Sequence, residues 1–165
     1  MAPACERCGC FETASVLANS VGNELAIGLA QAELARLTER DSPAKALGAM
    51  QDVLQRWTMA GDFANQMVTI RRIALLLGTI GHEEEAITLV SATRRDGIAE
   101  QLTQRDDVIT PLWERIGDKR SLASVSLGQL IGPTGVVDYA FDVIARVFLE
   151  DGMATTPTTD ETASK

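Results

Sequence analysis

Residues 46–92 read ALGAMQDVLQRWTMAGDFANQMVTIRRIALLLGTIGHEEEAITLVSA, and this stretch decides the fold class. Its apolar side chains recur at the spacing of one helical face, first in a stripe of Leu47, Met50, Leu54 and Trp57. The next segment carries two such stripes, made of Phe63, Met67, Ile70, Ala74 and Leu77 and of Ile73, Leu76 and Ile80. A helix that is apolar on two faces is expected to lie between neighbouring helices.

Residues that typically cap helices bound the segments of this stretch. Asp62 can accept hydrogen bonds from backbone N–H groups at a helix start, and Gly61 suits the left-handed conformation that follows a helix end. Upstream, Asn23 and Ser42 can cap two further helices, with Pro43 at the first position of the second. The sequence therefore predicts four consecutive helices joined by tight turns.

The helix boundaries recur at an equal spacing. Asn23 lies 39 residues before Asp62, and Ser42 lies 39 residues before Gly81. A period of this size is typical of arrays of helical hairpins, in which each hairpin buries its apolar face against the next. We therefore predict an all-α fold of tetratricopeptide-like stacked helical hairpins, an α-solenoid fragment.

The flanking regions extend this pattern less regularly. A short helix is predicted from Phe11 to about Asn19, and further helices over 98–104 and 112–116. A final helix is predicted after Thr134 or Gly135, with a stripe of Val137, Phe141, Ile144 and Phe148. No alternating run bounded by hairpin turns predicts a sheet. We expect a disordered tail over residues 1–10, a helical-repeat domain over 11–151 and a disordered tail over 152–165.

Composition limits the classes of function. The chain has 165 residues, or about one domain, and a formal net charge of −8. An acidic chain repels phosphate groups, which argues against direct binding of nucleic acids and of anionic membranes. No apolar run is long enough to span a bilayer and the start does not resemble a secretory signal, so we expect a cytoplasmic protein.

Three cysteines lie close together near the N-terminus, at Cys5, Cys8 and Cys10. The spacing of Cys5 and Cys8 is compatible with a metal site, but a closed zinc site needs four ligands and the only histidine is His82. We expect reduced thiols and no metal or other cofactor. A small metal- or redox-active protein built on these three cysteines remains the alternative.

Three stretches resemble a known family: residues 17–23, residues 46–92, and residues 115–118 with the helical region after them. They are similar to the tetratricopeptide-like helical segment of LuxR-type, MalT-like regulators with a signal-transducing ATPase module, which are common in actinobacteria. The matching positions are Trp57, Gly61, Asp62, Arg71, Leu76, Leu77, Gly81 and Ala86. The resemblance implies a role in transcription regulation and signal transduction, through the repeat part of such a regulator.

The catalytic and DNA-binding features of those regulators are missing from this sequence. It contains no GxxxxGK followed by Ser or Thr, and the glycines at 128, 132 and 135 have no phosphate-binding lysine beside them. His82 is followed by Glu83, but Ala86 stands where a metalloprotease helix has its second histidine. We therefore expect no enzyme activity and a truncated or stand-alone repeat segment, or alternatively a degenerate fragment without present function.

The leading hypothesis is a non-catalytic module for protein–protein interaction, since stacked hairpins present an extended surface to a protein or peptide. Arg71, Arg72 and Trp113 are the candidate partner-binding residues, because arginine and tryptophan are frequent at interface hot spots. Trp57 lies on an apolar stripe and is expected in the core. Uncapped repeat ends also predict self-association.

Overall fold

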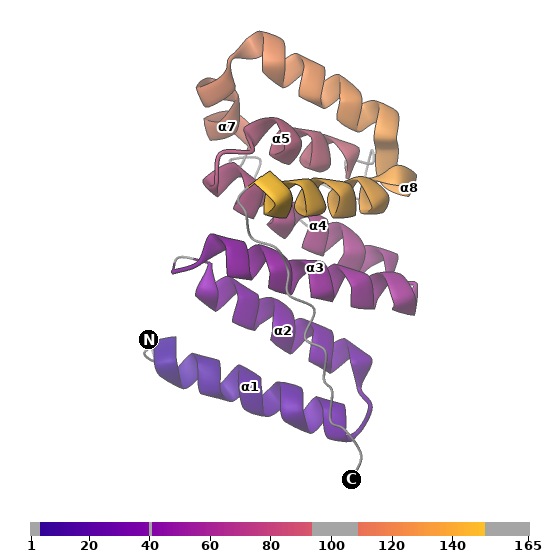
Figure 1. Ribbon diagram of the computed structural model, residues 1–165. Coiled ribbons are helices and arrows are strands. Elements are labelled where there is room, and N and C mark those ends of the chain that lie inside the picture. The colour runs from indigo at the N-terminus through magenta and orange to yellow at the C-terminus, as the bar shows by residue number, and fades with distance from the viewer. Residues whose placement is uncertain (1–3, 40, 94–108, 151–165) are drawn as a thin grey trace.

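The structure is a computed structural model that describes residues 4–39, 41–93 and 109–150 (Figure 1). These residues form helices and no strand, which confirms the all-α fold class for this part of the chain. The helices are α1 (Ala4–Ser20), α2 (Glu24–Thr38), α3 (Pro43–Ala60), α4 (Phe63–Thr79), α5 (Glu83–Ala92), α7 (Ile109–Ile116) and α8 (Asp118–Glu150).

Most of the predicted helix ends are confirmed. The side chains of Asn23 and Asp62 each accept a hydrogen bond from a backbone N–H three residues later, at 3.1 Å. Pro43 occupies the start of α3, and Gly61 closes that helix with a φ of 68°. The capping role predicted for Ser42 is wrong, because its side chain makes no capping hydrogen bond. Pro43 has no N–H, so the start of α3 has one unsatisfied backbone donor fewer.

The first five helices pack in chain order. Each of α1 to α4 contacts the helix that follows it, and Figure 1 shows them side by side with alternating direction. Helix α4 also contacts α8, so it is covered on two sides as its two apolar stripes predicted. The buried side chains of this region include the complete predicted α3 stripe and, from α4, Ile70, Ile73, Ala74, Leu76 and Leu77.

Helix α8 is interrupted at Gly132, the residue before Pro133. The φ of 61° and ψ of −178° at Gly132 are not helical. We call residues 118–131 its first arm and residues 133–150 its second arm. Helix α8 contacts α5 extensively and also α3 and α4, and Figure 1 shows the second arm returning across the stack. Chain reversal at the break therefore returns the C-terminal part of the chain to the core.

The stripe predicted for the final helix is partly wrong. The buried side chains of the second arm are Val136, Ala140, Val143, Ile144 and Val147, so only Ile144 of the predicted stripe is fully buried. Val137, Phe141 and Phe148 are partly buried at the margin of the core. The small side chain of Ala140 allows the arm to lie close to its neighbours, and the aromatic rings then flank the contact.

Some predicted boundaries differ from the structure, and others lie outside the described residues. Helix α1 begins at Ala4, before the Phe11 start that the sequence predicted. The helix predicted over 98–104 and the tail predicted over 152–165 lie outside the described residues. Among the described helices, none combines the length and the apolar character needed to cross a membrane.

Candidate binding cleft and exposed apolar surface

The two arginines predicted to bind a partner both contact other side chains of this chain. Arg71 Nε donates to Thr93 Oγ1 at 3.2 Å, and Arg72 Nη2 donates to Glu33 Oε1 at 3.2 Å. Burial raises the pKa of Glu33, but hydrogen bonds and positive charge from Arg36 and Arg72 outweigh it, so the pKa lies below 4.5. Both arginines are half-buried and join segments that are far apart in the sequence.

The two tryptophans lie in different environments. Trp57 is buried, as predicted, and its ring lies against Gly28 of α2. Trp113 is half-buried, and its Nε1 donates to Asp118 Oδ1 at 2.6 Å across the turn between α7 and α8. Trp113 therefore contributes to the junction between two helices.

The cysteines are only partly described. Cys10 is exposed with a free thiol, while the side chains of Cys5 and Cys8 lie outside the described part of the structure. Among the described side chains, no group of three or more histidines, cysteines and carboxylates is arranged to hold a metal ion.

The three glutamates that begin α5 form an unpredicted set of long-range ion pairs. Glu83 pairs with Arg115 Nε at 3.2 Å, Glu84 pairs with Arg120 Nε, and Glu85 pairs with Arg146 Nη2 at 3.4 Å. Their partners come from α7 and from both arms of α8, so only the folded-back chain brings them together.

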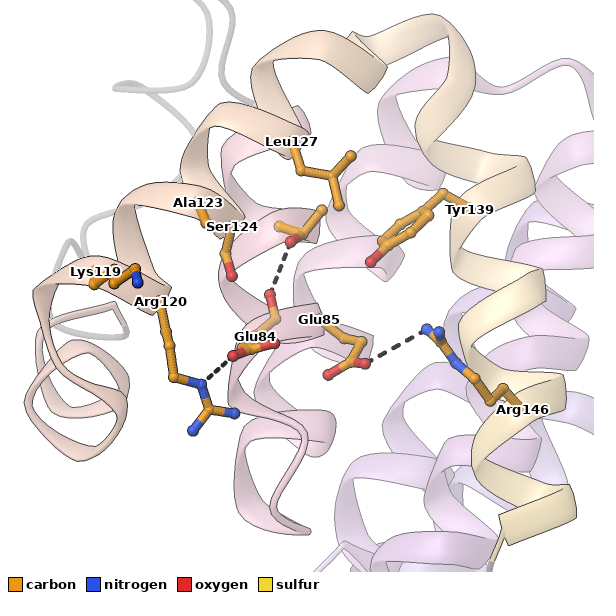
Figure 2. A pocket seen from close by; sticks show the side chains of 10 residues that line it. Glu84, Glu85, Lys119, Arg120, Ala123, Ser124, Leu127, Tyr139 and Arg146 are labelled. Carbon is orange, nitrogen blue, oxygen red and sulfur yellow. Dashed lines mark hydrogen bonds and ion pairs between the residues drawn. The ribbon is translucent and has the colours of Figure 1, made fainter.

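A cleft opens beside two of these ion pairs, between α5 and the two arms of α8 (Figure 2). It has a volume of about 500 Å³. The first arm contributes Lys119, Arg120, Ala123, Ser124 and Leu127, the second arm contributes Tyr139 and Arg146, and α5 contributes Glu84, Glu85 and Thr88. We call it the α5–α8 cleft.

Tyr139 is the partly buried aromatic residue of the α5–α8 cleft. Burial is the main cause that raises its pKa above 10, and the negative charge of Glu85 acts in the same direction. The phenol is therefore protonated at neutral pH and can donate a hydrogen bond. No feature of the sequence singled out this residue.

Exposed apolar side chains gather on α1, on α2 and in the turn between them. They are Val16, Leu17, Val21, Leu25 and Leu29, and we call them the α1–α2 apolar surface. The exposed fractions of Leu17 and Val21 are 65% and 71%. Val21, Leu25 and Leu29 are spaced four residues apart, so the two α2 members lie on one side of that helix.

Comparisons with protein-family models, with curated proteins and with solved structures found no match to this chain. The cleft and the apolar surface are therefore interpreted from their own chemistry.

Proposed function

We propose that this chain is a non-catalytic module for protein–protein interaction, built as a tetratricopeptide-like array of helical hairpins. In this proposal α2 with α3 and α4 with α5 are successive repeats, and α8 closes the array at one end. The resemblance to LuxR-type, MalT-like regulators suggests that the module contributes to transcription regulation and signal transduction in the cell interior.

Contacts at equivalent positions support the repeat interpretation. Glu33 of α2 and Arg72 of α4 are 39 residues apart, and they form an ion pair at 3.2 Å. The capping residues Asn23 and Asp62 have the same separation and the same capping geometry. Positive φ values at Gly22 and Gly61 mark matching turns. Equal local structure at an equal spacing is what stacked repeats produce.

The α1–α2 apolar surface is the observation on which the proposed function rests. Large apolar side chains that remain exposed together on neighbouring helices mark sites of protein interaction more often than single exposed residues do. In the structure, α1 contacts α2 as its principal neighbour. The internal helices are covered by other helices of the chain. A partner that packs on the α1–α2 apolar surface would cover α1 and α2 in the same way.

The test compares capture of partners by two double variants. Leu17→Ser with Val21→Ser removes part of the α1–α2 apolar surface, while Met59→Ser with Leu149→Ser is the matched control at sites 80% and 79% exposed. We expect one protein to be retained by the unaltered chain and by the control, and lost by the first variant. Direct titration with that purified protein should reproduce the difference. Equal retention by all three chains would contradict the proposal.

Self-association is a second candidate, favoured by exposed leucines at the other end of the stack. Leu122 and Leu130 on the first arm of α8 are 56% and 85% exposed. If copies associate through their ends, light scattering should show a mass that rises with protein concentration. A constant monomer mass would exclude this candidate and leave the α1–α2 apolar surface for a different protein.

A further inference from the structure

We propose that the α5–α8 cleft binds a small organic carboxylate, whose apolar part lies against Leu127 and the ring of Tyr139. This inference concerns a surface separate from the α1–α2 apolar surface and does not depend on the proposed protein partner. It rests on the charges, the hydrogen-bond donors and the apolar side chains that line the cleft (Figure 2).

The cleft is locally positive on an acidic chain. Three cations, Lys119, Arg120 and Arg146, line it together with two carboxylates, Glu84 and Glu85. The formal net charge of the whole chain is −8, so the local excess of positive charge is unusual for this molecule. Each carboxylate already pairs with one of the arginines.

Lys119 carries the unmatched charge. It makes no ion pair with another described residue, whereas Arg120 and Arg146 are each held by a glutamate of α5. An anion placed in the cleft would be attracted by the charge of Lys119, and neither ion pair would have to break. A cationic ligand would have to compete with the arginines for the two glutamates, so the cleft favours an anion.

Unused hydrogen-bond donors fit a planar carboxylate. A guanidinium carries five N–H donors, and the ion pairs to Glu84 and Glu85 use Nε of Arg120 and Nη2 of Arg146. The Tyr139 hydroxyl already makes side-chain hydrogen bonds with Thr88 and Arg146, so the donors left for carboxylate oxygens are the other guanidinium N–H groups. Arginine binds carboxylates through two parallel hydrogen bonds, which gives such a site directional preference.

The apolar part of the lining sets a second requirement on the ligand. Leu127 is 43% exposed, and it lines the cleft with Ala123 and the Tyr139 ring. Small-molecule sites typically combine apolar walls with a few polar groups in volumes of about 300–1,000 Å³, and the cleft lies within this range. An anion with an attached apolar group would therefore use more of the cleft than a bare anion.

Phenylacetate is the probe that tests both requirements. The full chain, labelled with ¹⁵N, is titrated with phenylacetate, with the neutral isostere phenylacetamide and with inorganic phosphate, while amide signals are followed by NMR. For a ligand of about ten non-hydrogen atoms, we expect a Kd of about 1 mM. The shifts should be saturable and centred on Leu127 and Tyr139. Loss of the carboxylate charge should weaken binding about tenfold.

Two lysine variants locate the charge that matters. Lys119→Gln should weaken phenylacetate binding about three- to fivefold, the range expected for one exposed charge pair. Lys45→Gln, at an exposed site on α3 outside the cleft, should bind as the unaltered chain does. Both variants should retain the NMR spectrum of a folded chain, since both side chains are exposed.

Several results would overturn the proposal. If phenylacetamide binds as tightly as phenylacetate, the charge of the ligand does not contribute to binding. If phosphate binds as tightly as phenylacetate, the apolar wall of the cleft does not contribute. An unchanged Kd in Lys119→Gln, shifts centred outside the α5–α8 cleft, or no saturable shift up to about 20 mM phenylacetate would each contradict the assignment.

Discussion

Individual glycines determine how closely the helices approach one another. A Cβ at Gly28 would lie 2.3 Å from Cη2 of Trp57, whereas a Cβ at Gly48 would lie 3.6 Å from Cζ of Phe148. The first distance is a severe overlap with a buried ring, and the second is an ordinary contact. An added methyl group would therefore clash at Gly28 on α2 and would fit at Gly48 on α3.

This contrast gives a matched pair of substitutions. Gly28→Ala should lower the free energy of unfolding by about 1–3 kcal/mol, because the indole ring of Trp57 must move. Gly48→Ala should raise it by about 0.5–1 kcal/mol, because alanine is the better helix former. Urea denaturation of both variants measures the two changes. Equal effects of the same sign would show that the Gly28–Trp57 contact is not formed.

The charge of Glu33 gives a prediction about pH. Its pKa is lower in the folded chain, so its contribution to stability is present above about pH 4.5 and is lost as the pH falls through the lowered value. Glu33→Gln should therefore destabilise the protein at pH 7 by less than about 1 kcal/mol. The difference from the unaltered chain should vanish in acid, as followed by urea denaturation at several pH values.

A matched control separates the ion pair from the general loss of negative charge. Glu12 is exposed on α1 and forms no ion pair with the other described residues, so Glu12→Gln should change stability little at either pH. A Glu33→Gln effect that persists unchanged at low pH would contradict an ionic origin.

For single helices, the apolar periodicity predicted where a helix forms better than it predicted which side chains that helix buries against its neighbours. The stripe of α3 was predicted completely because that helix buries residues at regular helical spacing. The stripes of α4 were predicted only in part, since Phe63 is 44% exposed and Met67 and Ile80 are partly buried. The stripe of the second arm of α8 was misplaced, because the break at Gly132 and the small side chain of Ala140 set which side faces α5. Those features act through tertiary packing, which helical periodicity does not encode.

The candidate sites were predicted less well for the same reason. Arg71, Arg72 and Trp113 were selected by residue type, and each proved to contact a side chain within the chain. The α5–α8 cleft depends on Glu85 and Arg146 meeting across the fold-back of α8. Residues that are distant in the sequence can be paired only once the path of the chain is known.

The junction of α5 and α8 can be tested through Gly128. A Cβ at this position would lie 2.4 Å from the carbonyl oxygen of Thr88, a backbone atom that cannot move alone. Gly128→Ala should push the two helices apart, lower the free energy of unfolding by about 1–3 kcal/mol and weaken phenylacetate binding in the cleft. Ser126→Ala, at an exposed site on the same arm, should change neither quantity much. Retention of full stability in Gly128→Ala would contradict the close packing.

At the scale of the whole molecule, the two ends of the chain differ in how they are covered. The second arm of α8 returns to the core, so α3, α4 and α5 are covered by the chain itself. Helix α1 has no comparable cover among the described residues, and the α1–α2 apolar surface remains exposed. This asymmetry leaves large apolar side chains exposed at the α1 end of the described helices.

A nuclear Overhauser contact between Gly48 and the ring of Phe148 tests whether the second arm of α8 returns to α3. A Cβ added at Gly48 would lie 3.6 Å from Cζ of Phe148, although the two residues are far apart in the sequence. We expect a strong cross-peak between the Gly48 α-protons and the Phe148 ring protons in the folded chain. Absence of that cross-peak, with both signals assigned and sharp, would show that the second arm of α8 does not return to α3.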